Sequence, residues 1–246
     1  MAVLPPSSLV IPAAGESSRL PGRQRKSYRD LAGRPLLLRT LEAFQNRDQG
    51  MGFIREIVLL VHPRELEKLK RDWRKPLEAL KVSCILAGGS TRAHSVALGV
   101  LATSPSSQLV LIHDAARPLV TPAEIRAVAQ AAWKRGAAIL ALEAFETVKK
   151  VSPQGRILKT LPRNELWLAQ TPQAFRRSWI HTSCKRWLQE GMRSPPTDDA
   201  GFLEGRRPVW VVPGSGGNLK VTTPQDLRRA RILWNLSHEA PCKVFH

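Results

Sequence analysis

Residues 109–143, LVLIHDAARPLVTPAEIRAVAQAAWKRGAAILALE, contain a strand, a helix and another strand in direct succession. The runs 109–114 and 137–143 are short and mainly apolar, which is typical of strands buried on both faces. Between them, apolar residues recur about every 3.6 positions over 121–135, and Thr121 followed by Pro122 is a helix start signal. This strand–helix–strand unit predicts a parallel sheet covered by helices.

The same alternation continues on both sides of this unit. We expect further strands at 9–13, 56–61, 82–87 and 208–213, and further helices at 35–44, 65–80, 92–102, 176–190 and 224–236. Residues 144–172 depart from it, because two short β-like pieces flank the turn at 152–155 and predict a projecting hairpin, here called the β-arm. No linker separates two units, so the sequence predicts a single α/β domain over 1–246 with a mostly parallel sheet.

The composition is basic. The 246 residues include 38 Lys and Arg against 20 Asp and Glu, a formal net charge of +18. Because 43% of the residues are hydrophobic, a disordered polycation is excluded, and the candidate partners are nucleic acid, an anionic membrane surface or small anionic substrates. Aromatic residues make up only 6% of the chain, and tryptophans such as Trp73 and Trp133 fall within helical patterns, which disfavours a nucleic-acid surface.

The three cysteines, Cys84, Cys184 and Cys242, are odd in number and form no CxxC pair. This pattern excludes a disulfide framework and a thiolate zinc site, and it suits a reducing compartment. No signal sequence and no apolar run of about 20 residues is present, so we expect a cytoplasmic protein.

The loop after the first expected strand is the strongest candidate for a binding site, since ligands of doubly wound sheets bind at the carboxyl ends of the strands. Small residues at 12–15 are followed by a basic stretch, with seven Arg or Lys between Arg19 and Arg39 against Asp30 alone. Small residues let backbone N–H groups approach phosphates, and the cations reach the same oxygens. The stretch matches neither GxxxxGK[ST] nor GxGxxG, and a solvated basic loop is the alternative.

Other segments follow later strands in the same way. Residues 87–95 are either a turn or a backbone nest for a ligand. Asp114 can meet a ribose hydroxyl or a hydrated metal ion, and a helix-capping or Arg-paired carboxylate is the alternative. His113 lacks a second ligand at metal spacing, so it is read as a satisfied strand-end histidine. Lys220 follows the glycine-rich turn 214–217, where a surface lysine is the alternative.

Taken together, these segments resemble the 2-C-methyl-D-erythritol 4-phosphate cytidylyltransferase family of the nonmevalonate isoprenoid pathway. The matching blocks, in the family's order, are PAAGESSRL (12–20) with Lys26 downstream, AGGSTRAHSV (87–96), HDAARP (113–118), RNELWLAQTPQAF (163–175), TDDAGFLE (197–204) and NLKVTTPQDL (218–227). The resemblance covers nearly the whole chain. It implies a three-layer, Rossmann-like nucleotide-diphosphosugar transferase fold and a homodimer clasped by the β-arm at 144–172.

The resemblance also implies an activity: CMP transfer from CTP to 2-C-methyl-D-erythritol 4-phosphate, with Mg²⁺ and release of pyrophosphate. It places catalytic cations at Arg19, Lys26, Lys220 and Arg163. It places the CTP contacts at Ala13, Ala14, Gly15, Gly89, Ser90, Ser95, Asp114, Ala115 and Arg117, with Asp114 also near the metal ion. Thr147 and Arg163 would bind the acceptor phosphate, in this family across the dimer interface.

Four positions depart from the family pattern. The family often has glycine at Ser17, an acid at Ser90, proline at Arg25 and Asp-Thr where Glu146-Thr147 stands. The cations Arg19, Lys26 and Lys220 are retained.

The chemistry fits this set of residues. A phosphate monoester is largely ionised at neutral pH because its second pKa is about 6, so the attack on CTP needs no general base. Cations are needed to bring the polyanions together and to stabilise the transferring phosphoryl group. The alternatives are a ribitol-5-phosphate cytidylyltransferase of the same fold and a basic nucleic-acid-binding protein.

Overall fold

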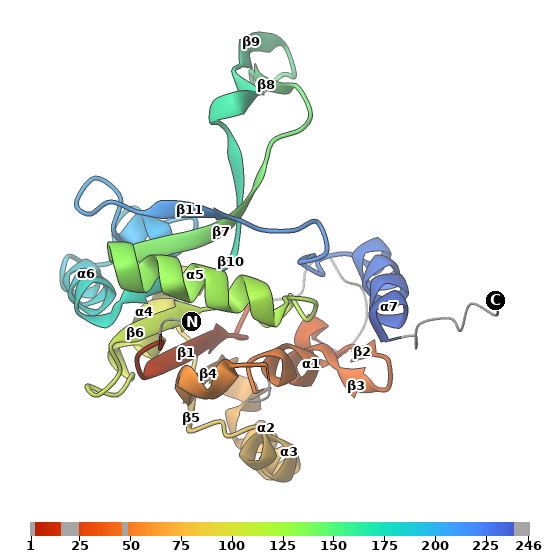
Figure 1. Cartoon of the computed structure of the whole chain (residues 1–246), viewed down its shortest axis with the longest axis vertical. Coiled ribbons are helices and arrows are strands. Elements are labelled where there is room, and N and C mark those ends of the chain that lie inside the picture. Colours follow the sequence, from red (N-terminus) through yellow and green to blue (C-terminus); the bar gives the residue numbers. More distant parts are fainter. Residues whose placement is uncertain (1–2, 16–24, 46–48, 239–246) are drawn as a thin grey trace.

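The computed structural model describes residues 3–15, 25–45 and 49–238 of the chain. Its centre is a seven-stranded sheet with the order β11-β7-β10-β6-β1-β4-β5 (Figure 1). The strands are β1 (Ser7–Pro12), β4 (Ile54–Val61), β5 (Cys84–Ala87), β6 (Leu109–Ile112), β7 (Ala137–Glu143), β10 (Trp167–Arg176) and β11 (Trp210–Pro213). All neighbouring pairs are parallel except those of β10, which runs antiparallel to both β6 and β7. The expected α/β fold with a mostly parallel sheet is confirmed.

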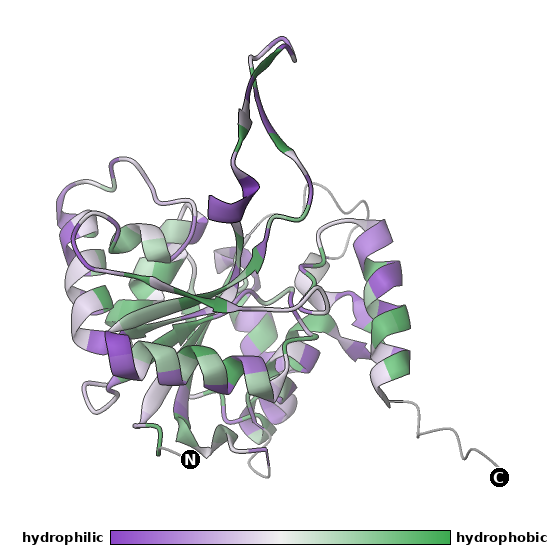
Figure 2. Ribbon diagram, turned by 45° about the horizontal axis from the view of Figure 1, so that its top comes forward, coloured by the Kyte–Doolittle hydropathy of each residue, from purple (hydrophilic) through white to green (hydrophobic). Residues whose placement is uncertain are grey.

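Helices cover both faces of this sheet. On one face lie α1 (Leu36–Ala43), α2 (Leu66–Asp72), α3 (Arg74–Ala79) and α5 (Pro122–Arg135), and on the other lie α4 (Arg92–Leu101) and α6 (Arg177–Gln189). Successive residues of β1 serve the two faces in turn: Leu9 and Ile11 belong to the first core, and Val10 belongs to the second. All three are fully buried, which explains why the strand reads as a continuous apolar run. Figure 2 shows the sheet as the most hydrophobic part of the ribbon.

The capping signals at 121–124 act as expected. Thr121 Oγ1 accepts a hydrogen bond from the Glu124 N–H at 3.2 Å, and the Glu124 carboxylate accepts one from the Thr121 N–H at 2.9 Å. This capping box, with Pro122 in the first turn, begins α5 between β6 and β7.

The expected helix at 65–80 is two helices. The short helix η3 (Pro63–Glu65) comes first. α2 then ends at Asp72, and α3 begins at Arg74. Pro76 explains the break, because a proline has no N–H to donate to the carbonyl four residues earlier and fits only the first turn of a helix.

Strand β10 differs from the expectation. Its polar residues Gln170, Thr171 and Gln173 and the proline at 172 argue against a central strand. The register against β7 shifts between Ala169 and Gln173, and this irregularity accommodates the proline inside an otherwise regular ladder. Consequently 167–172, which the sequence pattern assigns to the β-arm, is part of the main sheet.

The β-arm itself projects from the domain (Figure 1). It contains β8 (Val148–Val151) and β9 (Ile157–Leu161), paired antiparallel in a sheet of their own, and η4 (Arg163–Glu165) at its base. Its apolar side chains are exposed in a single chain: Phe145, Val151, Ile157 and Leu158 are 49–74% accessible.

The chain closes with α7 (Pro224–His238), which packs near the short hairpin of β2 (Asp30–Leu31) and β3 (Arg34–Pro35). Leu31, Leu36, Val221 and Ala230 form a small core of their own there. Two more short helices, η2 (Met51–Phe53) and η5 (Ala200–Phe202), complete the described elements besides η1 (Lys26–Tyr28).

Candidate active site

The carboxyl ends of β1, β5 and β6 meet at one edge of the sheet. Strand β1 lies between β4 and β6, so the chain leaves it at the point where the strand order reverses, which is the usual ligand site in such sheets. The Ala13 N–H donates to the Leu60 carbonyl at 2.7 Å, and the Gly88 N–H donates to the Val61 carbonyl at 2.7 Å. These bonds fix the first residues beyond β1 and β5 against β4.

Asp114, two residues beyond the end of β6, lies at the centre of a group of cations. Its carboxylate is 2.8 Å from Lys220 Nζ, 3.1 Å from Arg92 Nη2 and 3.5 Å from Arg117 Nε. The Asp114 side chain is 9% exposed, whereas those of Lys220 and Arg92 are 37% and 32% exposed. The two cations therefore remain open to a ligand while they hold the carboxylate.

These contacts fix the charge of the aspartate. Burial alone would raise the pKa of Asp114, but Arg92, Lys220 and Arg117 outweigh burial and hold that pKa well below its usual range. Asp114 is therefore a carboxylate at any physiological pH.

Arg92 continues the network to a second acid. It stands at the start of α4, and its guanidinium donates to both oxygens of Asp199, at 2.7 and 2.9 Å. Asp199 is fully buried, and although burial alone would lower the pKa of Arg92, the two carboxylates around the guanidinium raise it. A bidentate pair of this kind fixes the plane of the guanidinium, so the N–H groups that Arg92 donates to Asp114 have a fixed orientation.

A set of buried polar groups supports Asp114 from behind. The Asp114 N–H donates to Thr171 Oγ1 at 3.1 Å, so the Thr171 hydroxyl can donate in turn to His113 Nδ1, which is 3.1 Å away. His113 Nε2 then donates to the Arg117 carbonyl at 3.0 Å. Burial lowers the pKa of His113 to about 4, so the ring is neutral and structural.

Arg117 and Lys220 are tied together by the loop that follows β11. Arg117 Nη1 donates to the Asn218 carbonyl at 2.7 Å, and the Val221 N–H donates to the Ala116 carbonyl at 2.8 Å. Asn218 Nδ2 donates to the Thr171 carbonyl at 2.8 Å, which anchors the same loop to β10. The position of Lys220 therefore depends on three segments distant in sequence.

The loop before α4 is held by close packing. Thr91 caps the helix by accepting from the His94 N–H at 3.0 Å, and Ser95 Oγ accepts from the Gly89 N–H at 3.0 Å. A Cβ on Gly88 would lie 2.2 Å from the Ala14 Cβ, so only glycine lets the loops after β1 and β5 approach this closely.

Two adjoining cavities open at this edge. One, of about 100 Å³, is lined by Ala13, Ala14, Gly15, Ser27, Ser95, Asp114, Ala115 and Lys220, among others. The other, of about 510 Å³, is lined by His62, Pro63 and the 88–92 loop. They share Ala14, Gly15, Arg92 and Ser95, and so form one continuous cleft from the cations at Asp114 to the glycines at 88–89.

Comparison with known proteins identifies the family. The profile of the 2-C-methyl-D-erythritol 4-phosphate cytidylyltransferases matches residues 8–235. The chain belongs to this family. The cytidylyltransferase of that name from Pelotomaculum thermopropionicum is 41% identical over 225 residues, which cover 91% of this chain and 92% of the relative. A second relative of the same name, from Syntrophus aciditrophicus, is 40% identical over 89% of this chain and 91% of its own.

Solved cytidylyltransferase structures have the same fold. The crystal structure of 2-C-methyl-D-erythritol 4-phosphate cytidylyltransferase from Thermus thermophilus aligns with a TM-score of 0.74 at 30% identity, covering 92% of this chain and 98% of that one. The 4-diphosphocytidyl-2C-methyl-D-erythritol synthase from Anaerococcus prevotii aligns with a TM-score of 0.77 at 27% identity, covering 94% and 99%. No helix in the part of the chain that the structure describes is long and apolar enough to cross a membrane.

In this member of the family, the cleft brings together Lys220 and most of the residues expected at CTP. The latter are Ala13, Ala14, Gly15, Gly89, Ser90, Ser95, Asp114 and Ala115. Arg117, expected as a CTP contact, is 8% exposed and lies behind Asp114, so it supports the carboxylate and does not line the cleft.

Other expected residues lie elsewhere. Arg163 and Thr147 are exposed on the β-arm, and Arg163 donates to the Phe145 carbonyl at 2.6 Å; neither lines the cleft of its own chain. Arg19 lies outside the described residues. The backbone of Lys26 begins η1, but its side chain also lies outside the description.

The sequence pattern does not reveal the roles of Arg92, Asp199 and Thr171. All three fall in segments that match the family, AGGSTRAHSV, TDDAGFLE and RNELWLAQTPQAF, but their spacing along the chain carries no sign that they meet. Only the pairing of β10 with β6 brings Thr171 beside His113 and Asp114.

Proposed function

We propose that this protein transfers CMP from CTP to 2-C-methyl-D-erythritol 4-phosphate, giving 4-diphosphocytidyl-2-C-methyl-D-erythritol and pyrophosphate in isoprenoid precursor biosynthesis. Family membership supports the reaction. The observation that carries it in this chain is the cleft in which Lys220 and Arg92 flank Asp114 beside the small residues Ala13 to Gly15.

The cleft suggests how CTP lies. Its cationic end, beside the backbone of Ala13, Ala14 and Gly15, suits phosphates, since backbone N–H groups and cations stabilise negative charge there. Its other end, at Gly89, Ser90 and Ser95, suits the cytosine ring. Asp114 and Ala115, between the two, suit the ribose.

The reaction is then a displacement at the α-phosphorus of CTP. An oxygen of the acceptor phosphate forms a new P–O bond as the bond to the β-phosphate oxygen breaks, and pyrophosphate leaves with the electron pair. The nucleophile is already ionised, so the chain must supply orientation and positive charge. We assign Lys220 to the charge on the transferring phosphoryl group, and Arg19 and Lys26 to the triphosphate and the departing pyrophosphate.

The residues present fit a magnesium ion carried mainly by the nucleotide. Among the described residues, no three His, Cys, Asp or Glu side chains lie close enough together to hold a metal ion, and Asp114 is the only carboxylate on the cavity next to Lys220. Mg²⁺ is commonly bound by one or two carboxylates together with substrate phosphates. Asp114 would hold the ion, which would neutralise phosphate charge.

The acceptor site is proposed to be shared between two copies of the chain. Thr147 and Arg163 suit a phosphate but are exposed on the β-arm, away from the cleft of their own chain. The exposed apolar side chains of the arm, Phe145, Val151, Ile157 and Leu158, suit burial against a second copy. A homodimer clasped by the arms would bring the Arg163 of one protomer to the cleft of its partner.

A reducing, cytoplasmic location is also proposed. It is supported by Cys84 and Cys184, which are free thiols in the described part of the chain.

The reaction is tested by pyrophosphate release from purified protein with CTP and Mg²⁺, supplied in parallel with 2-C-methyl-D-erythritol 4-phosphate or ribitol 5-phosphate. We expect release with the first acceptor and a much lower rate with the second. Faster release with ribitol 5-phosphate would favour the alternative enzyme, and no release with either acceptor would refute the proposal.

A further inference from the structure

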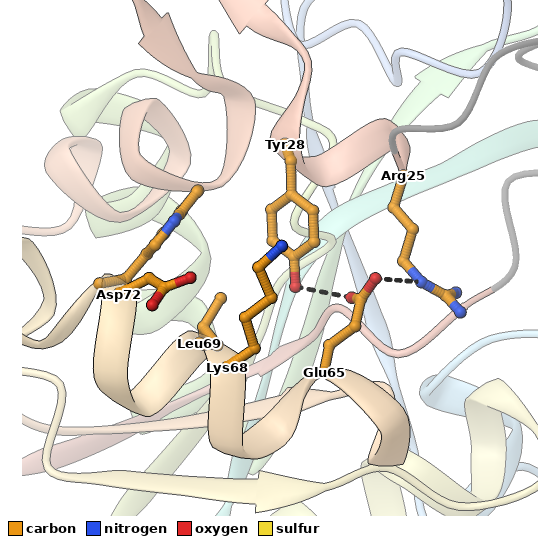
Figure 3. A pocket seen from close by; sticks show the side chains of 7 residues that line it. Arg25, Tyr28, Glu65, Lys68, Leu69 and Asp72 are labelled. Carbon is orange, nitrogen blue, oxygen red and sulfur yellow. Dashed lines mark hydrogen bonds and ion pairs between the residues drawn. The ribbon is translucent and has the colours of Figure 1, made fainter.

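A separate cavity, of about 220 Å³, lies between η1 and the helices η3 and α2. It is lined by Arg25, Tyr28, Glu65, Lys68, Leu69, Asp72 and Trp73. None of these residues lines the cleft described above. On one wall of this cavity, Tyr28 and Arg25 point toward the carboxylate of Glu65 (Figure 3).

Glu65 uses both carboxylate oxygens. Its Oε1 accepts a hydrogen bond from Arg25 Nε at 2.8 Å, and its Oε2 accepts one from the Tyr28 hydroxyl at 2.9 Å. Arg25 and Glu65 are partly buried, with side chains 21% and 26% exposed. Charge-assisted hydrogen bonds with this degree of burial hold their partners more firmly than an ion pair on the open surface.

Tyr28 is fixed from a second side. Its ring packs edge-on against Trp73, with ring centroids 5.1 Å apart. Burial and the hydrogen bond to Glu65 raise the pKa of Tyr28, so its hydroxyl remains a donor. The contact with Trp73, between α2 and α3, therefore ties η1 to the helical layer.

Arg25 links Glu65 to the loop after β1. Its Nη1 donates to the Gly15 carbonyl at 3.4 Å, while its Nε donates to Glu65. Gly15 lines the proposed phosphate end of the cleft, so one guanidinium joins that backbone to the start of η1.

The geometry points to Glu65 as a positioning residue of the cleft. Its two partners, Arg25 and Tyr28, flank Lys26 along the chain, so one carboxylate sets the place of the backbone that carries Lys26. We infer that Glu65 acts on the reaction through Lys26. This inference rests on the proposed function, because it needs Lys26 to serve pyrophosphate departure.

The test is a double-mutant cycle in the full-length protein, with CTP, Mg²⁺ and 2-C-methyl-D-erythritol 4-phosphate. Glu65→Gln keeps the shape of the side chain but replaces one acceptor by a donor. We expect kcat to fall about 10-fold, since a small displacement of a catalytic group is costly. The KM for the acceptor should not change. In a Lys26→Ala background the same substitution should lower kcat no further.

Two variants complete the design. Glu67→Gln, close by in sequence on α2 and with a side chain 82% exposed, is the matched control and should leave kcat unchanged. Arg25→Gln removes the same hydrogen bond between Arg25 and Glu65 from the arginine side. It replaces Glu65→Gln in the test if the melting temperature shows that Glu65→Gln does not fold. It should lower kcat similarly and be non-additive with Lys26→Ala.

The outcomes separate the two ideas. An inactive wild-type protein would refute the proposed function. An active wild type in which Glu65→Gln and Arg25→Gln keep full kcat would overturn this inference alone. A fall that multiplies with that of Lys26→Ala would also overturn it, because it would show that Glu65 acts independently of Lys26.

Discussion

The cleft at the end of the sheet and the β-arm differ in whether their side chains find partners within a single chain. Around Asp114, the described cations Arg92 and Lys220 pair with carboxylates of the same chain, and Asp199, His113 and Thr171 behind it are buried. On the arm, β8 and β9 pair only with each other, and Ile157 is 62% exposed. One chain therefore builds the cleft by itself, whereas the arm presents a surface that suits a second chain.

The two regions also differ in how much of the fold each one requires. The cleft depends on contacts between segments far apart in sequence, such as Arg92 with Asp199, so it requires the whole fold. The arm depends on a local hairpin, so its role can be removed without unfolding the domain. The two regions can thus be tested separately by substitution.

The largest effect is expected at the cleft. Lys220→Ala removes the cation 2.8 Å from Asp114, and we expect kcat to fall on the order of 100-fold, because preorganised charges of this kind contribute about 3 kcal/mol. Steady-state pyrophosphate release measures it. Lys75→Ala, an exposed lysine on α3, is the control and should be neutral. Unchanged kcat in Lys220→Ala would remove Lys220 from the mechanism.

The second effect concerns the arm. Ile157→Asp places a charge where we expect an apolar contact, and a symmetric dimer carries the change twice. With about 1.5 kcal/mol or more for each buried isoleucine, the dimer dissociation constant should rise by about 100-fold. Light scattering coupled to size exclusion reads out the mass.

The matched control for this variant is Ile232→Asp. Ile232, on α7, is 61% exposed, close to the 62% of Ile157, but lies away from the arm. It should leave the dimer intact. A wild-type monomer, or a dimer that survives Ile157→Asp, would show that the arm does not hold two copies together.

The third effect concerns the stability of the buried polar groups behind Asp114. His113 titrates near pH 4 when folded and near 6.5 when unfolded, so the unfolded chain takes up its proton first as the pH falls. The stability it contributes is complete above about pH 6.5 and is lost toward pH 4, by about 3 kcal/mol. Urea unfolding at pH 7 and pH 4 should therefore show a smaller loss in His113→Gln than in the wild type. Equal losses would mean that the ring is not buried and neutral.

The smallest effect is expected at the acceptor. Arg163→Ala should raise the KM for 2-C-methyl-D-erythritol 4-phosphate by about 10-fold, the usual loss when one charge-assisted hydrogen bond is removed. The KM for CTP should stay within error of the wild type. A raised KM for CTP with an unchanged acceptor KM would place Arg163 at the nucleotide.

Much of the fold follows from periodicity. The strands at 109–114 and 137–143 and the helix at 121–135 are predicted within a few residues, because each is a continuous run with clear start signals. Strand β10 cannot be predicted in this way, since Gln170, Thr171 and Pro172 interrupt its apolar pattern at the point where the register shifts. Pro76 indicates the break between α2 and α3, but the apolar periodicity continues across it over 65–80 and predicts one helix.

The site divides in the same manner. Asp114 and Lys220 follow strands directly, so their place at the sheet edge is predictable from position alone. The ion pair of Arg92 with Asp199 joins residues 107 positions apart in sequence and depends on how α4 and η5 pack, which no local pattern records.

The +18 charge is explained only in part, because Arg71, Arg74 and Lys75 lie exposed on α2 and α3, away from the cleft.

A subunit-mixing experiment tests most directly whether the cleft of one chain works with the arm of the other. Lys220→Ala and Arg163→Ala proteins are mixed in equal amounts, allowed to exchange subunits, and assayed at limiting acceptor. If the site is shared, each heterodimer contains one site free of both substitutions, and the mixture should regain roughly one quarter of wild-type activity, since half the dimers are heterodimers with one intact site in two. Activity that stays at the average of the two separate variants would contradict the shared site and place each arm with its own cleft.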